Sequence, residues 1–239
     1  MRRFARFLAP PVLVTLLAVG ATLPAHAATA STLEGLDVSH WQGVIDWKQV
    51  ADAGYDFAFA KATDGRTFKD PGFGYNREGA EFRGLAFGAY HFARPGKGPN
   101  DPAMEVNHFL NVAYPESGEL IPVLDLEDSG GLTTDELIAW TWGFLIEFES
   151  RTGLKPMIYT GNYFWLNFMG NTQEFAQAGY DLLWLAHWGV PKPHVPANDW
   201  AGHGAKFWQY TSCGNVPGID GCVDLDHYFG QSLDAVLVP

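Results

Sequence analysis

Two carboxylates near the middle of the chain have the types and the spacing that acid–base chemistry requires. Asp125 and Glu127 end the mostly apolar run IPVLDLE. If this run is a β-strand, residues two apart face the same side and lie about 6.6 Å apart along the chain. Desolvation and mutual repulsion then drive their pKa values apart, so that one carboxyl stays ionised while the other holds a proton near neutral pH. A proton donor beside an anionic stabiliser is what cleavage of a glycosidic bond requires.

Three further aspartates lie in short apolar runs of the same kind. Asp37 stands in GLDVS, and Asp224 and Asp226 alternate with apolar residues in VDLD. A single Asp at a strand end is more often a helix cap or a hydrogen-bonding loop residue. In a parallel barrel, however, the carboxyl ends of the strands meet at one face. Several acidic strand ends in one chain therefore predict a shared acidic site.

The elements that must position these acids alternate along the chain. Short runs rich in Val, Ile and Phe predict eight strands, at 36–39, 55–62, 86–93, 120–127, 156–160, 182–187, 206–210 and 223–227. Longer amphipathic stretches predict five helices, at 47–52, 75–83, 103–112, 134–151 and 163–168. Strand and helix in alternation imply parallel strands with right-handed crossovers. The fold expected is α/β, a single irregular TIM-like barrel whose last connections lack helices.

The longest predicted helix carries signals for both of its ends. Thr133 or Thr134 can act as the N-cap, with Glu136 at or next to the capping-box position and Asp135 in the first turn. Gly153 follows the helix where a left-handed residue is expected. The 239-residue chain contains no internal repeats, so one domain is predicted.

Composition and charge exclude several classes of protein. The chain has 15 Lys and Arg against 27 Asp and Glu, a net charge of −12, which opposes nucleic-acid binding because phosphates require a positive surface. Aromatic residues make up 15% of the chain, and they either line a cleft with stacking faces or fill the core. The sequence contains no Gly-x-Ser-x-Gly, His-Glu-x-x-His or phosphate-binding loop. No metal or other cofactor is predicted.

The N-terminus has the three parts of a secretory signal peptide. Three arginines stand within the first six residues, an apolar run follows, and Ala-His-Ala at 25–27 forms a cleavage site. Two prolines in the apolar run oppose the alternative, a membrane anchor. We expect residues 1–27 to be removed, leaving a catalytic domain at 28–239. Loss of three arginines and no acids changes the net charge from −12 to −15. The product is expected to be secreted, soluble and without a membrane segment.

Cys213 and Cys222 are the only cysteines of the chain and stand nine positions apart. In an oxidising compartment, a pair this close in sequence is most simply a disulfide that closes a short loop. A catalytic thiol or a metal site is the weaker alternative, because no His lies at ligand spacing from either cysteine.

Several segments, taken in their order, resemble one known family. They are DVSHWQG from Asp37, KATDG from Lys61, GAYHF from Gly88, the central DLE, and WQY with GIDG and VD near the C-terminus. Together they resemble the glycoside hydrolase family 25 lysozymes, the Chalaropsis type. The resemblance covers about residues 36–229. Each segment is a modest signal, but the ordered set is specific.

The resemblance implies an irregular eight-stranded barrel that hydrolyses the β-1,4 bond between N-acetylmuramic acid and N-acetylglucosamine in bacterial peptidoglycan. It implies that Glu127 is the general acid and that Asp125 orients the substrate N-acetyl group or stabilises positive charge. Asp37 and Asp224 are expected to line the site as the other two catalytic acids. Further substrate contacts are expected at Tyr90, Lys61, Trp184, Trp208, Gln209 and Asp226. Glycan strands of peptidoglycan are the expected partner of a monomeric enzyme.

Two positions depart from the family pattern. Asp64 stands where Glu is usual and His187 where Tyr is common, so the role of each is open.

One alternative to a lysozyme is a catalytically silent carbohydrate-binding barrel, which the intact acids oppose. The other is a chitinase-like barrel, but such barrels carry a longer D-x-D-x-E run, and Val123 stands at its first position here.

The stereochemical outcome has two interpretations. A separation of about 6.6 Å between Asp125 and Glu127 along a strand approaches that of an inverting pair. Both acids project from one strand, however, and need not flank opposite faces of the sugar. The substrate also carries an N-acetyl group that can act as an internal nucleophile. We therefore predict net retention by neighbouring-group participation, with Glu127 as acid and then base and Asp125 steering the acetamide.

Overall fold

The computed structural model describes residues 32–239, so the predicted signal peptide at 1–27 lies outside the described residues. The strands are β1 (Leu33–Val38), β2 (Phe57–Asp64), β3 (Phe68–Lys69), β4 (Ala86–Phe92), β5 (Val123–Asp125), β6 (Met157–Gly161), β7 (Leu183–Ala186), β8 (Phe207–Gly214) and β9 (Val223–Tyr228). The α-helices are α1 (Trp47–Asp52), α2 (Phe73–Phe82), α3 (Asp101–Val112), α4 (Thr134–Thr152), α5 (Asn162–Phe168), α6 (Glu174–Gln177) and α7 (Pro196–Ala201). Two 3-10 helices are η1 (His40–Gln42) and η2 (Leu233–Val236).

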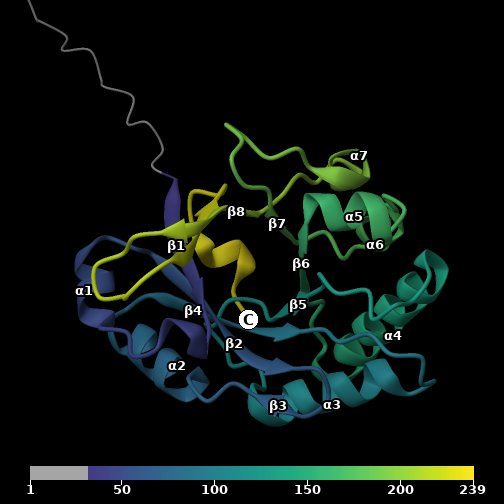
Figure 1. Ribbon diagram of the computed structural model, residues 1–239, viewed down its shortest axis with the longest axis horizontal. Helices are drawn as coiled ribbons and strands as arrows, with labels where there is room; N and C mark the ends of the chain where they lie inside the picture. Colours follow the sequence, from purple (N-terminus) through teal and green to yellow (C-terminus); the bar gives the residue numbers. More distant parts are fainter. Residues whose placement is uncertain (1–31) are drawn as a thin grey trace, which may run out of the picture. The chain divides into compact units, whose positions relative to one another are not determined.

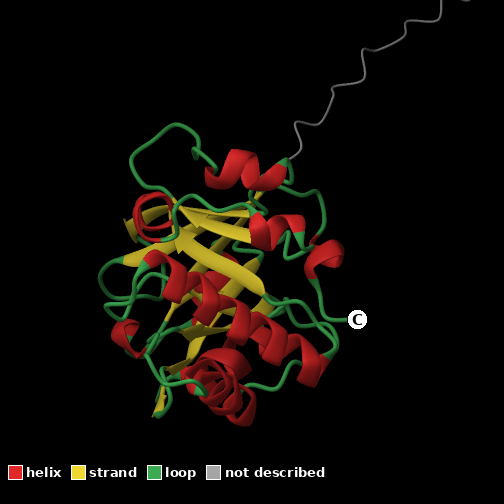
Figure 2. Cartoon of the chain, turned by 90° about the vertical axis from the view of Figure 1, so that its right-hand side faces the viewer, coloured by secondary structure: helices red, strands yellow, loops and turns green. Residues whose placement is uncertain are grey.

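Eight of the described strands form a closed barrel. Their order is β1-β9-β8-β7-β6-β5-β4-β2, and pairing of β1 with β2 closes the ring. Strand β3 lies outside the ring and pairs only with the carboxyl end of β2. The helices lie outside the strands (Figures 1 and 2). The predicted α/β barrel is confirmed. Residues 32–239 hold seven α-helices against the five expected, and none of the helices described there is long and apolar enough to cross a membrane.

The last strand runs against the others, which the alternation of elements did not predict. β9 is antiparallel to both β8 and β1, whereas the remaining pairings of the ring are parallel. The loop 215–222 that joins β8 to β9 is shorter than the dozen or more residues of a parallel crossover. The expectation of parallel strands throughout was therefore wrong here. As a result, the beginning of β9 lies at the rim where the other strands end.

Aromatic side chains fill the barrel interior. Phe57, Phe59 and Phe207 are fully buried and pack edge to face, with ring centroids between 5.1 and 5.9 Å apart. Glycines make room for them, because a Cβ on Gly35 would lie 2.1 Å from the Phe57 ring and one on Gly88 would lie 2.5 Å from the Phe59 ring. Much of the aromatic excess therefore serves the core, where each ring buries a large apolar surface.

The C-terminal segment covers the end of the barrel at which β5 begins. The Ile121 N–H donates to the carbonyl of Val236 at 2.8 Å, and the Val238 N–H donates to the carbonyl of Glu119 at 2.7 Å. Both valines are buried against the interior residues. This end of the barrel is closed, which leaves the opposite rim for a site.

Helix α4 begins and ends as the sequence predicts. Thr133 is the N-cap: its Oγ accepts the N–H of Glu136, and the Glu136 carboxylate accepts the N–H of Thr133 at 2.8 Å. Gly153 ends the helix at φ +74°, in the left-handed region that favours glycine. The capping box thus sets the start of the longest helix.

Cys213 and Cys222 form the predicted disulfide, with a Cα–Cα distance of 4.3 Å. Replacing both by serine is expected to lower the free energy of unfolding by about 2–3 kcal/mol, because the cross-link no longer restricts the unfolded chain. Activity should fall modestly, since Asp224 stands two residues after Cys222. Denaturant unfolding of the wild type and the double variant measures the effect. Equal stability of the wild type with and without reductant would show that the bond does not form in solution.

Candidate active site

A cavity of about 230 Å³ opens at the rim of the barrel where the parallel strands end. It is lined by Asp37, Val38, Ser39, Trp41, Gln42, Lys61, Tyr90, Phe92, Asp125, Glu127, Tyr159, Trp184, Trp188, Gln209 and Asp224. The lining side chains come from all eight strands of the ring and from loops that follow them. Segments far apart in the sequence therefore build one site.

The strands bring the four predicted catalytic acids to this cavity. Asp37 lies near the end of β1, and Asp125 is the last residue of β5, with Glu127 two positions beyond it. Asp224 lies near the beginning of β9 and pairs in register with Asp37. The antiparallel direction of β9 places its first residues, rather than its last, at this rim.

Of the six predicted substrate contacts, Lys61, Tyr90, Trp184 and Gln209 line the cavity. Trp208 does not, because neighbouring side chains of a strand face opposite sides and Gln209 takes the inner position. The Trp208 indole N–H donates to the carbonyl of His187 at 2.9 Å, and its ring stacks on Phe229. The expectation that Trp208 contacts the substrate in this cavity is not supported by its position.

Asp226 also lies away from the cavity surface. It shares the inner face of β9 with Asp224, but it is fully buried, and its Oδ1 accepts the indole N–H of Trp184 at 2.7 Å. Burial raises the pKa of Asp226 to about 8, because the carboxylate loses its hydration. Asp226 therefore holds the Trp184 side chain in place at the cavity lining, and Asp226 itself is too deeply buried to contact a ligand.

The central pair of acids is arranged to hold protons. Burial raises the pKa of Asp125, and the charge of Glu127 raises it further. Glu127 remains in contact with water at the mouth of the cavity, yet desolvation by the surrounding walls raises its pKa as well. The nearby charge of Lys61 lowers the pKa of both carboxyls. A proton retained on an accessible carboxyl is what a general acid requires.

The other two acids have raised pKa values for a similar reason. Burial raises the pKa of Asp224 to about 6. The pKa of Asp37 lies well above its ordinary value, first because of burial and then because of Asp226 and Asp224. Several carboxyls crowded into one partly dry site cannot all ionise at the same pH. Perturbed carboxyls in a cleft are typical of functional sites.

An arginine at the edge of the site connects two acidic residues. The Arg94 guanidinium donates to both carboxylate oxygens of Asp64, at 2.8 and 3.1 Å, and to Asp128 at 2.8 Å. Asp128 directly follows Glu127. Arg94 thereby links Asp128, next to the predicted general acid, to Asp64 at the end of β2. The charge of Arg94 also lowers the pKa of Glu127.

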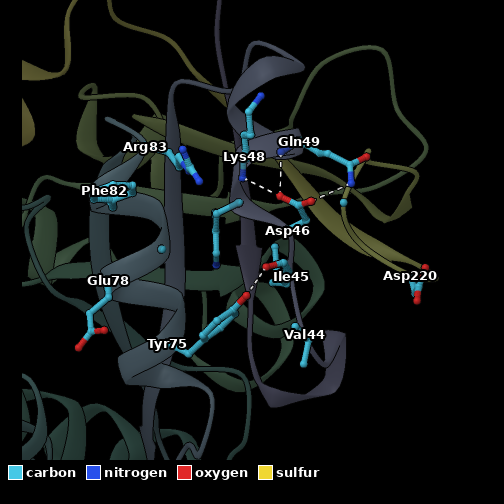
Figure 3. Close-up of a pocket in the computed structure, with 13 residues that line it drawn as sticks. Val44, Ile45, Asp46, Lys48, Gln49, Tyr75, Glu78, Phe82, Arg83 and Asp220 are labelled. Carbon is cyan, nitrogen blue, oxygen red and sulfur yellow. Dashed lines mark hydrogen bonds between the residues drawn. The ribbon is translucent and has the colours of Figure 1, made fainter.

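A larger cavity, of about 850 Å³, lies outside the barrel between α1 and α2 (Figure 3). Its central carboxylate, Asp46, is used as the N-cap of α1: it accepts the N–H groups of Lys48 and Gln49 and the Gln49 side chain. Tyr75 donates to the carbonyl of Ile45 at 2.6 Å. These polar groups already have partners within the protein, and none of the four predicted catalytic acids lies here. The rim cavity is therefore the candidate active site.

Comparison with known proteins decides the family. The model of the family described as "Glycosyl hydrolases family 25" matches residues 36–219. The chain belongs to glycoside hydrolase family 25. This membership confirms the resemblance found in the sequence and makes the protein a glycoside hydrolase of the lysozyme type.

Characterised relatives and solved structures agree with this family 25 assignment. The chain is 36% identical over 214 residues to Lysozyme M1 of Streptomyces globisporus, covering 86% of this chain and 70% of that protein. It is 30% identical over 209 residues to an N,O-diacetylmuramidase of Chalaropsis sp, covering 81% and 96%. The crystal structure of the bacterial lysozyme from Streptomyces coelicolor superposes with a TM-score of 0.75 at 35% identity, covering 84% of this chain and 93% of that chain.

The two departures from the family 25 pattern have defined surroundings. Asp64 does not line the cavity and is the ion-pair partner of Arg94. His187 also lies off the cavity lining; its Nδ1 accepts the N–H of His194 at 3.1 Å. Burial and the neighbouring His194 lower the pKa of His187. Both residues therefore hold loops at the rim and do not enter the cavity.

Sequence reasoning missed several residues at or beside the site of this family 25 enzyme, among them Tyr159, Trp41, Trp188 and Arg94. Tyr159 lies in the middle of β6, lines the cavity and pairs in register with Asp125, the last residue of β5. Trp41 and Trp188 line the cavity while 80% and 51% exposed, which suits them to stack on a sugar. Arg94 stands two residues after β4 and carries no motif that identifies it.

Replacing Arg94 by Gln is expected to move the alkaline limit of activity of the family 25 enzyme to higher pH. Loss of the cation, together with loss of the ion-pair partner of Asp128, raises the pKa of Glu127. A general acid acts only while protonated, so a raised pKa preserves it to higher pH. A pH–activity profile measures the shift. Arg83→Gln, an exposed arginine at the end of α2, is the control and should leave the profile unchanged; an unshifted Arg94→Gln profile would contradict the prediction.

Proposed function

We propose that this family 25 enzyme is a secreted lysozyme. It hydrolyses the β-1,4 bond between N-acetylmuramic acid and N-acetylglucosamine in bacterial peptidoglycan, and it acts as a monomer. The observation that carries the proposal is the meeting of Glu127 and Asp125 in one cavity, with the exposed Trp41 and Trp188 beside them. Relatives named lysozyme and N,O-diacetylmuramidase support the substrate class. Export is supported by the signal-like pattern of residues 1–27.

The first chemical step uses Glu127 and the substrate itself. Glu127, which water reaches, donates its proton to the glycosidic oxygen as the bond to the anomeric carbon breaks. The carbonyl oxygen of the neighbouring N-acetyl group bonds to the anomeric carbon from the other face and forms an oxazolinium ion. One oxygen of Asp125 is buried and has no hydrogen-bond partner among the described residues. The other oxygen of this carboxylate, at the cavity lining, accepts the N–H of the acetamide and orients its carbonyl for attack.

The second step returns the enzyme to its first state. The Glu127 carboxylate takes a proton from water as the water oxygen attacks the anomeric carbon, and the oxazolinium ring opens. Asp224, whose pKa of about 6 leaves it mostly ionised at pH 7, stabilises positive charge on the sugar ring. Asp37 lies in register beside Asp224 and contributes in the same way when ionised.

Identification of the products tests the proposed function. Purified peptidoglycan is digested with the enzyme, and the reducing ends are identified by mass spectrometry after borohydride reduction. Muramic acid at the new reducing end is expected. N-acetylglucosamine at that end, or cleavage of chitin oligomers in preference to peptidoglycan, would favour a chitinase-like glycosidase. Binding without any release of reducing ends would favour a silent carbohydrate-binding barrel.

The proposed participation of the N-acetyl group predicts retention. The first product formed should be the β-anomer, because two successive inversions at the anomeric carbon restore the starting configuration. Proton NMR of the anomeric signal, recorded before mutarotation, measures this outcome. An initial α-anomer would overturn the neighbouring-group mechanism while leaving the muramidase assignment intact.

A further inference from the structure

Gln209 is a buried amide at the wall of the cavity, and its orientation is determined by its neighbours. Its Nε2 donates to Oδ2 of Asp37 at 2.6 Å. Its Oε1 accepts the phenol O–H of Tyr159 and the indole N–H of Trp188, each at 3.0 Å. An indole N–H can only donate, so the atom that faces Trp188 must be the amide oxygen. The amide N–H is therefore directed at Asp37.

Asp37 needs such a donor because acids surround it. Asp224 and Asp226 face it from β9 and Asp125 from β5, and each of these charges raises its pKa, while burial raises it most. The phenols of Tyr90 and Tyr159 lie close enough to be affected by the charge of Asp37. The hydrogen bond from Gln209 acts in the opposite direction and lowers the pKa of Asp37. A donor that bonds to the charged form favours that form.

The two groups that hold Gln209 differ in their exposure. Tyr159 is buried on β6, whereas Trp188 is 51% exposed at the rim of the cavity, in the loop after β7. A sugar that contacts the Trp188 ring therefore contacts the same side chain that holds the Gln209 oxygen. This connects the rim of the cavity to the buried Asp37 through two hydrogen bonds.

We propose that Gln209 is a positioning residue for Asp37, held in one orientation by Tyr159 and Trp188, and not the direct substrate contact that the sequence predicted. Its N–H donor favours the ionised form of Asp37 and fixes the direction of that carboxyl. Its hydrogen bond from Trp188 connects this donor to a sugar bound at the rim. This role deepens the proposed function and rests on it only where hydrolysis is the readout.

The test removes the two donors that orient the amide while keeping an aromatic ring at each position. In Tyr159→Phe/Trp188→Phe, Gln209 can turn its oxygen toward Asp37, so Asp37 loses its donor. The titration midpoint of the Asp37 carboxyl, followed by carbon NMR and assigned with Asp37→Asn, should move upward by about one pH unit or more. Gln209→Glu, which places a second carboxyl next to Asp37, should raise the Asp37 midpoint further. This readout needs no substrate.

The activity profile gives the second readout. An ionised Asp37 is lost as pH falls through its pKa, so a raised pKa moves the acidic limit of activity to higher pH. At neutral pH, kcat should fall more than KM rises. Tyr180→Phe is the matched control, because it removes a phenol that donates to Glu149 at 2.6 Å, away from the cavity. It should change neither readout.

Each outcome decides one question. An unchanged Asp37 midpoint in the folded double variant would overturn the positioning role. If the double variant fails to fold, Trp188→Phe alone, at a half-exposed position, should give a smaller upward shift, and an unchanged midpoint there would also overturn the role. A shifted midpoint in an enzyme that releases no muramic acid ends would sustain the positioning role and reject the proposed function.

Discussion

Replacing Glu127 by Gln is expected to lower the hydrolysis of cell walls by about 10²–10⁴-fold, the usual contribution of a general acid. The amide has nearly the same shape as the carboxyl but holds no acidic proton for the leaving oxygen. Glu127 lies beyond the end of β5 and in contact with water, so the change creates no cavity and leaves no buried charge unpaired. The stability of the protein should therefore be close to that of the wild type.

Release of reducing ends from purified walls measures the loss, and thermal unfolding shows that the fold is intact. Glu78→Gln is the matched control, because Glu78 is exposed on α2, away from the rim cavity, and undergoes the same chemical change. Equal release by the wild type and Glu127→Gln would reject Glu127 as the proton donor. A loss of equal size in Glu78→Gln would point to a general effect of the substitution.

Replacing His91 by Ala is expected to lower the free energy of unfolding by about 3–5 kcal/mol, the largest loss of stability predicted for this chain. His91 is fully buried between β4 and α3. Its Nδ1 pairs with the Thr63 hydroxyl at 2.7 Å and its Nε2 with the Glu105 carboxylate at 2.8 Å. Without the imidazole, Glu105 is a buried carboxylate whose remaining described partner is the N–H of Arg94. An uncompensated buried charge is costly.

Denaturant unfolding, monitored by tryptophan fluorescence, gives the free energy for each variant. His203→Ala is the control, because His203 is exposed and its change should alter the free energy by less than about 0.5 kcal/mol. Burial lowers the pKa of His91, which favours the neutral imidazole at neutral pH. A loss below 1 kcal/mol in His91→Ala would show that water or rearranged neighbours compensate for the missing imidazole.

Local patterns in the sequence were sufficient to predict the main elements and the four central acids. Short apolar runs between amphipathic stretches identified all eight strands of the ring, because a strand buried on both faces must be nearly continuously apolar. Thr133, Glu136 and Gly153 located the ends of α4, because caps depend only on residues a few positions apart. The acidic strand ends indicated the site, because a carboxylate in an apolar run is costly unless it is used or paired.

Other features depend on contacts between residues far apart in the chain. The direction of β9 follows from its two neighbours and a short loop, and only that direction brings Asp224 to the rim beside Asp37. Trp208 and Gln209 are adjacent in sequence but face opposite sides of β8, a distinction that requires the register of the barrel. Arg94 gains its role from Asp64, 30 positions before it, and Asp128, 34 positions after it.

The sequence by itself determined the family of this protein, its barrel of eight strands and the acids at its centre, because these depend on residue type and short spacings. The tertiary structure alone decided which side chains reach the cavity, which carboxyls are buried together and how Gln209 is oriented. The physical reason is that pKa shifts and hydrogen-bond orientation arise from distance and desolvation in space. Gln209 and Asp37 are 172 positions apart in the chain, yet their side-chain atoms lie 2.6 Å apart.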